Sequence, residues 1–134
     1  ALGVLFESAL QHLADRPEGY YTLPDAAKAF LRTLPAAWDD TKLVDGFPGK
    51  DVTMARRKGN DWYLAGINGE LREKRKNIKL GFLADNVKYK LTLIADGAHD
   101  KEFATQYLLV DKTSAIDVKM LRRGGFSAVL TPVK

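Results

Sequence analysis

The sequence predicts a mainly β fold: an antiparallel β-sandwich of about eight strands, preceded by one or two α-helices. From Thr41 onward, apolar and polar residues alternate with a period of two, which is typical of strands with one buried face. Turn-forming clusters rich in glycine and aspartate separate these runs, and no helical pattern lies between them. This arrangement favours antiparallel sheets over a parallel α/β fold.

The first residues have helical periodicity. Leu2, Leu5, Phe6 and Leu10 recur at spacings of three, one and four residues, so we expect an amphipathic helix from about residue 2 to Asp15. No capping residue precedes this stripe. A helix so apolar at its start would leave these four side chains exposed unless an upstream segment or a second copy of the chain covered them. We therefore predict an interdomain or self-association interface there.

A second, shorter helix is better delimited. Thr22 and Asp25 have the spacing of a capping box, and Pro35 ends the helical pattern. The change of period after this helix divides the chain in two. We predict a helical segment over residues 1–34 and a β-sandwich domain over residues 35–134.

The strongest local signal is a β-hairpin. Val52–Arg57 and Trp62–Ile67 are β-prone runs, and the short segment between them contains Gly59 and Asn60, which tolerate the positive φ of a tight turn. Further strands are expected at Lys42–Val44, Asn77–Phe82, Val87–Leu93, Thr105–Val110, Ile116–Leu121 and Phe126–Thr131. Such a series of short strands forms either a barrel or a sandwich, and we predict the sandwich.

Composition excludes several classes of function. The chain has no cysteine, which excludes disulfides, thiolate metal sites and a cysteine nucleophile. No apolar run approaches the roughly 20 residues of a membrane-spanning helix. The net charge of +4 arises mostly from Leu71–Lys79. That stretch lacks interleaved aromatic residues, so we expect a solvated loop, with nucleic-acid binding as the weaker alternative.

No residue is assigned to catalysis or to metal binding. Acid–base catalysis by paired carboxyl groups needs both groups to face one substrate, but Asp39 and Asp40 are adjacent and would point to opposite faces of a strand. We expect a surface-loop or capping role for this pair. Glu7 lies in the predicted first helix, where a structural role is expected. His12 and His99 lack the spacing of metal ligands.

Trp62 and Tyr63 are the candidates for carbohydrate binding, because an exposed aromatic ring can stack on a sugar. Neighbouring residues of a strand point to opposite faces, so at most one of the two rings lies in a two-layer core. The other is expected on the outer surface or under a loop. Packing in the core or an interface is the competing interpretation for each ring.

The hairpin also resembles a known family. Two arginines, Lys-Gly, two polar residues, Trp-Tyr and Gly-Ile-Asn follow one another within Met54–Asn68. This order is similar to that in the C-terminal domain of glycoside hydrolase family 97, a family of α-glucosidases and α-galactosidases. Further similarity lies at Phe6-Glu7-Ser8, Gln11–Asp15, Leu34-Pro35, Trp38–Thr41 and Gly124-Gly125-Phe126. The resemblance implies that residues 1–34 are the end of a catalytic (β/α)₈ barrel and that the rest is an accessory sandwich.

The same resemblance implies a role without chemistry. The catalytic glutamates and the calcium ion of the family belong to the barrel, and no segment of this chain matches the segments that hold them. We expect no catalytic residue and no cofactor in the chain, with calcium in the parent enzyme. The expected partners are the upstream barrel of the same polypeptide, a second copy of the chain, and the parent's oligosaccharide substrate. The expected location is the periplasm or the exterior of a bacterium.

The family resemblance, the aromatic residues and the basic stretch lead to three hypotheses about function. The first is a structural, interdomain or oligomerisation domain of a family 97 α-glycosidase. The second is a carbohydrate-binding module that holds glycans on an aromatic face. The third, and weakest, is a nucleic-acid-binding domain that uses the basic stretch.

Overall fold

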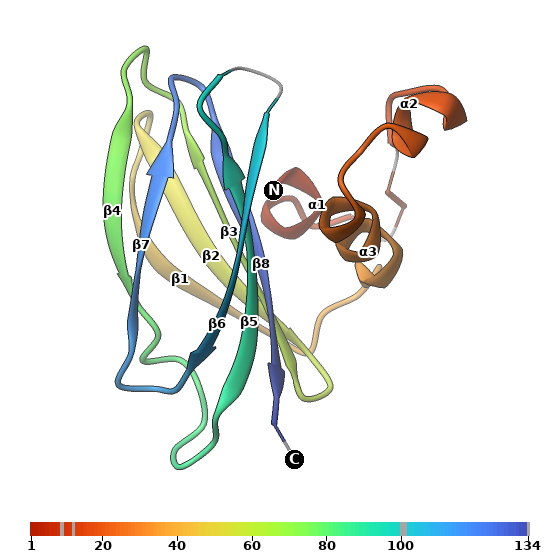
Figure 1. Cartoon of the computed structure of the whole chain (residues 1–134). Helices are drawn as coiled ribbons and strands as arrows, with labels where there is room; N and C mark the ends of the chain where they lie inside the picture. Colours follow the sequence, from red (N-terminus) through yellow and green to blue (C-terminus); the bar gives the residue numbers. More distant parts are fainter. Residues whose placement is uncertain (9, 12, 100–101, 134) are drawn as a thin grey trace.

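The computed structural model describes residues 1–133 apart from residues 9, 12, 100 and 101. Within this part of the chain, three short helices precede eight strands (Figure 1). The helices are α1 (Leu2–Leu5), α2 (Pro17–Tyr21) and α3 (Asp25–Thr33). The strands are β1 (Asp40–Phe47), β2 (Asp51–Lys58), β3 (Asp61–Asn68), β4 (Lys74–Lys79), β5 (Tyr89–Asp96), β6 (Phe103–Val110), β7 (Ala115–Met120) and β8 (Gly125–Pro132).

The strands form two antiparallel sheets. The larger has the order β1-β2-β3-β8-β5-β6, and the smaller contains β4 and β7. The last strand therefore lies between β3 and β5, while β1 and β6 are the two edges of the large sheet. This architecture confirms the predicted mainly β fold of about eight antiparallel strands.

The large sheet is the middle layer of three, with the small sheet on one face and the helices on the other (Figure 1). Alternate residues of its strands fill the core between the sheets, where the side chains of β4 and β7 meet them. The buried residues of this core include Leu64, Ile78, Leu91, Leu93, Val118, Met120, Phe126 and Leu130.

The opposite face of the large sheet packs against the helical segment. Val4 and Leu5 of α1 and Ala27 and Phe30 of α3 form a second buried cluster with residues of β2, β3, β5 and β8. The predicted division at residue 34 lies in the connection between α3 and β1. The division itself stays a prediction.

The prediction of a first helix from about residue 2 to Asp15 is wrong for most of its length. α1 ends at Leu5, and Phe6 has an extended backbone with φ −90° and ψ 133°. The Ser8 hydroxyl donates to the carbonyl of Leu10 at 2.6 Å, a local bond that competes with helix formation. Pro17 is the first residue of helix α2, as its fixed φ suits a first helical position.

Helix α3 matches the second predicted helix, but its capping box does not form. Pro24 is the N-cap residue and makes no side-chain capping bond. The Thr22 hydroxyl donates instead to the carbonyl of Gly19 at 2.7 Å. None of the described helices is long and apolar enough to cross a membrane.

The predicted hairpin is present as β2 and β3, with Lys58 paired to Asp61. Gly59 supplies the positive φ of the turn, at 58°. The Asp39 carboxylate accepts hydrogen bonds from the Gly59 N–H at 2.7 Å and from the Lys58 ammonium at 3.1 Å. These bonds hold the pKa of Asp39 below its usual value, the bond from Gly59 being the larger cause. Asp39 thus has the capping role that was expected.

Candidate functional site

Trp62 and Tyr63 lie on opposite faces of β3. Trp62, 5% exposed, belongs to the core between the sheets, with its ring 5.0 Å from that of Phe82. Tyr63, 4% exposed, lies under the helices, 5.2 Å from the ring of Trp38 and 6.1 Å from that of Phe30. Neither ring presents a face to solvent. A carbohydrate-binding role for these two residues stays a prediction.

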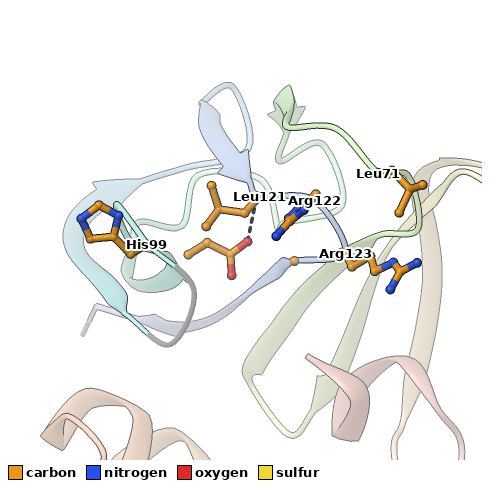
Figure 2. A pocket seen from close by; sticks show the side chains of 7 residues that line it. Leu71, His99, Leu121, Arg122 and Arg123 are labelled. Atoms are coloured by element: carbon orange, nitrogen blue, oxygen red, sulfur yellow. Dashed lines mark hydrogen bonds between the residues drawn. The ribbon is translucent and has the colours of Figure 1, made fainter.

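A polar pocket of about 530 Å³ lies where the loops after β3, β5 and β7 meet (Figure 2). The described residues that line it are Leu71, Asp96, His99, Leu121, Arg122, Arg123 and Gly124. The Asp96 carboxylate accepts N–H bonds from Leu121 at 2.8 Å and from Gly125 at 2.9 Å. Leu121 follows β7 and Gly125 begins β8, so Asp96 holds the two ends of the β7–β8 turn together.

This pocket does not have the chemistry of a glycosidase. Hydrolysis needs two carboxyl groups about 5–10 Å apart across the bond that breaks. Among the described lining residues, Asp96 is the one carboxylate, and the turn already uses it. The described residues also contain no group of three or more histidine, cysteine, aspartate or glutamate residues that could hold a metal ion. His99 lines the pocket, and His12 lies outside the described residues.

The basic stretch is not the solvated loop that was expected. Residues 74–79 form strand β4, and two of its three lysines, Lys74 and Lys76, pair with carboxylates of the facing sheet. Lys74 and Lys76 both bind the carboxylate of Asp51, which is 5% exposed. Lys76 also binds Asp45 at 2.6 Å, and Lys74 binds Glu70 at 2.6 Å. The pairs with Asp45 and Asp51 join the two sheets, so Lys74 and Lys76 are not free to form a basic surface for nucleic acid.

The carboxylate of Asp51 is the centre of this ionic clamp, which we define as Asp45, Asp51, Glu70, Lys74 and Lys76. Burial alone would raise the pKa of Asp51, but the hydrogen bonds from Lys74 and Lys76 outweigh burial and hold the pKa below its usual value. The same bonds raise the pKa of Lys74 and of Lys76. No local pattern predicts the clamp, because its members come from β1, β2, β4 and the loop before β4 and meet only when the two sheets pack together.

The four residues of the predicted interface do not lie on one helix face. Leu5 is buried against the large sheet, and its carbonyl accepts a bond of 3.3 Å from the buried guanidinium of Arg56. Leu2, Phe6 and Leu10 are exposed. The interface role of this group stays a prediction.

A second exposed apolar surface lies on β6, one edge of the large sheet. This strand reads FATQYLLV and contains no charged residue. Its exposed side chains include Phe103, Tyr107, Leu108 and Leu109, and Tyr107 is 73% exposed. Natural proteins usually protect a free strand edge with charges, proline or a bulge. β6 has none of these.

The other edge of the large sheet is protected. β1 contains Asp40, Lys42 and Asp45, and its pairing with β2 is interrupted by a bulge between Leu43 and Asp45. Charges and bulges both hinder the addition of another strand. The alternation at Thr105–Val110 predicts a strand but not an edge, because strand order depends on long-range pairing.

The large sheet has one protected edge and one edge suited to contact with another protein, so the fold and its surface define a β-sandwich domain with an available edge. Comparison with known families shows which kind of β-sandwich domain this is. Residues 37–131 match the family model described as glycosyl-hydrolase 97 C-terminal, oligomerisation. The chain belongs to this family, which confirms the resemblance seen in the hairpin.

Two curated relatives extend the match over nearly the whole chain. The chain is 33% identical over 131 residues to a retaining α-galactosidase from Bacteroides thetaiotaomicron, covering 95% of this chain and 19% of that protein. It is also 33% identical over 129 residues to a probable retaining α-galactosidase from Streptomyces bingchenggensis, covering 96% and 19%. The chain thus spans about a fifth of the length of these relatives.

Solved structures agree with the family assignment. A glycoside hydrolase family 97 enzyme from Pseudoalteromonas sp. strain K8, in complex with panose, superimposes with a TM-score of 0.91 at 25% identity. That match covers 99% of this chain and 22% of the enzyme. A β-arabinopyranosidase superimposes with a TM-score of 0.80 at 28% identity, covering 95% of this chain and 20% of that one.

Proposed function

We propose that this family 97 oligomerisation domain serves a retaining α-galactosidase, in which it assembles and braces the enzyme while a barrel of the same polypeptide carries the chemistry. The observation that supports the substrate class is the 33% identity to two relatives named as retaining or probable retaining α-galactosidases, along 95% and 96% of the chain. The accessory role rests on the family match over residues 37–131.

The proposal assigns no catalytic step to this chain. The carboxylate in the loop pocket, Asp96, is bound by two backbone N–H groups and has no described carboxylate partner in the lining. A calcium ion, implied by the family resemblance, has no set of three ligands among the described residues. On the family resemblance, we propose that calcium belongs to the barrel of the parent enzyme. We also propose export to the periplasm or the medium, as is typical of the family.

The substrate proposal is tested with the polypeptide encoded by the complete reading frame that contains this chain. Aryl α-galactosides, α-glucosides and β-arabinopyranosides are compared, and NMR follows the anomer that is released first. The proposal predicts preferential α-galactoside hydrolysis with α-galactose as the first product. Preference for either other substrate, or release of β-galactose first, would contradict it.

The accessory role is tested with the 134-residue chain alone. We expect no turnover of any of the three substrates, because Asp96 is the one carboxylate among the described residues that line the loop pocket and hydrolysis needs two. Turnover that persists through several independent purification schemes would show that the domain itself has a catalytic site.

A further inference from the structure

We propose that a second copy of this chain pairs with the free edge of β6 in antiparallel register, so that two large sheets join into one. The inference rests on the assembly role described above and specifies its surface. A free strand edge presents unpaired N–H and C=O groups to any strand that can approach it. β6 is eight residues long without a charge, and every second residue of this strand turns its N–H and C=O groups away from β5 to the free edge, whereas β1 has charges and a bulge.

The side chains of β6 favour a strand as the occupant of this edge. Tyr107 pairs with Thr92, which lines a groove with helix α3, so Tyr107 lies on the helix-covered face of the sheet. Leu108 pairs with Leu91, which belongs to the core between the sheets. Exposed apolar groups therefore lie on both faces of the edge. An added strand would extend both faces and cover both groups, whereas a helix laid on one face would cover only one.

The sequence of β6 is compatible with pairing to itself. In an antiparallel pair, directly opposed residues have the same hydrogen-bonding type, so a two-fold axis passes through one residue position. An axis at Tyr107 places Tyr107 opposite its own copy and Thr105 opposite Leu109. All of these lie on the same face, where aromatic and branched cross-strand pairs are favourable. No like charges meet, because the strand has no charge.

The absence of cysteine from the chain makes the register testable by disulfide formation. Directly opposed residues have Cβ atoms about 4.5–5.5 Å apart, close to the separation in a disulfide. Tyr107→Cys is therefore expected to form a disulfide-linked dimer under mild oxidation. Leu43→Cys is the matched control, since Leu43 is 71% exposed on the protected edge β1. We expect at least about tenfold less dimer from Leu43→Cys, because its edge is blocked.

A charge on the edge gives an independent test. Leu109→Lys introduces the kind of residue that protects natural edges, and two copies would place it near the partner strand. We expect the dissociation constant of the dimer to rise about tenfold or more, equivalent to about 1.4 kcal/mol. Leu43→Lys, on the other edge, is expected to leave the constant unchanged. Far-UV circular dichroism checks that each variant is folded.

The outcomes separate this inference from the assembly role. If the wild-type chain dimerises but Tyr107→Cys forms no disulfide and Leu109→Lys dimerises normally, pairing through β6 is wrong and the assembly role stands. If the wild-type chain and the complete polypeptide are both monomers at all concentrations, the assembly role falls as well. Should Leu109→Lys fail to fold, the disulfide test decides alone, because Tyr107 is highly exposed and its replacement disturbs no packing.

Discussion

The hydroxyl of Tyr63 donates a hydrogen bond of 2.8 Å to the main-chain carbonyl of Thr33, the last residue of α3. The two residues are 30 positions apart and lie on either side of the predicted domain boundary. Burial raises the pKa of Tyr63 above its usual value, so the phenol stays protonated and remains a donor at neutral pH. The helical segment is thus held on the sheet by a specific polar contact as well as by apolar packing.

Replacing Tyr63 by phenylalanine should weaken this docking. The substitution keeps the ring but leaves the Thr33 carbonyl without its donor, so we expect the free energy of unfolding to fall by about 1 kcal/mol. Amide hydrogen exchange should accelerate in α3 and stay unchanged in β4. Tyr21→Phe is the control, because Tyr21 is exposed. Equal effects of the two substitutions would show that the bond to Thr33 contributes nothing.

Gly66 is required by close packing in the core between the sheets. A Cβ atom at this position would collide with the ring of Phe126 and approach the Thr53 hydroxyl oxygen to 2.9 Å. We expect Gly66→Ala to lower the free energy of unfolding by about 1–3 kcal/mol, measured by urea denaturation. At Gly81 a Cβ would meet nothing within 4 Å, so Gly81→Ala should be close to neutral. The account is contradicted if both variants are equally stable.

The ionic clamp should be sensitive to loss of its central carboxylate. Asp51→Asn leaves Lys74 and Lys76 without their shared partner. Removing one member of a fully buried ion pair costs about 3–5 kcal/mol, but these lysines retain some contact with solvent, so we expect a loss of about 1–2 kcal/mol. Asp85→Asn removes an exposed pair with Lys112 and should have little effect. Thermal or urea unfolding measures both, and a neutral Asp51→Asn would refute the clamp.

The clamp also predicts how stability depends on pH. The pKa of Asp51 and that of Asp45 are lowered in the folded chain, so protons bind these carboxylates more readily in the unfolded chain. Their contribution to stability is present above the unfolded pKa of about 4 and is lost as the pH falls through the lower, folded values. We expect the free energy of unfolding to drop steeply below about pH 4. Asp51→Asn should flatten this drop; an unchanged profile would contradict the assignment.

The sequence was enough to predict those parts of the fold that depend on residues close together in the chain. The hairpin of β2 and β3 follows from two β-prone runs around Gly59, and the alternation of Trp62 and Tyr63 predicts that they occupy opposite faces. The predicted strand Asn77–Phe82 was displaced, since β4 begins at Lys74. From the sequence alone, the lysines at the start of β4 are expected in a solvated loop. In the structure they pair with Asp51 of the facing sheet, so the earlier start of β4 depends on a contact between sheets.

The rest depends on contacts that are distant in sequence. The stripe of Leu2, Leu5, Phe6 and Leu10 has helical spacing, yet Ser8 bonds locally and the helix ends at Leu5. Leu5 is buried against the large sheet, whereas the other three side chains are exposed. The β6 edge, likewise, is defined by the insertion of β8 between β3 and β5, which no local pattern reveals.

The most direct test of the central claim, that this chain is an assembly domain whose contact surface is β6, is sedimentation equilibrium of the chain over a wide concentration range. The account predicts an average molar mass that rises from 14.9 kDa towards twice that value. Leu109→Lys should shift this rise to higher concentration, and Leu43→Lys should not. A wild-type mass that stays at 14.9 kDa throughout, or a rise that Leu109→Lys leaves unchanged, would contradict it.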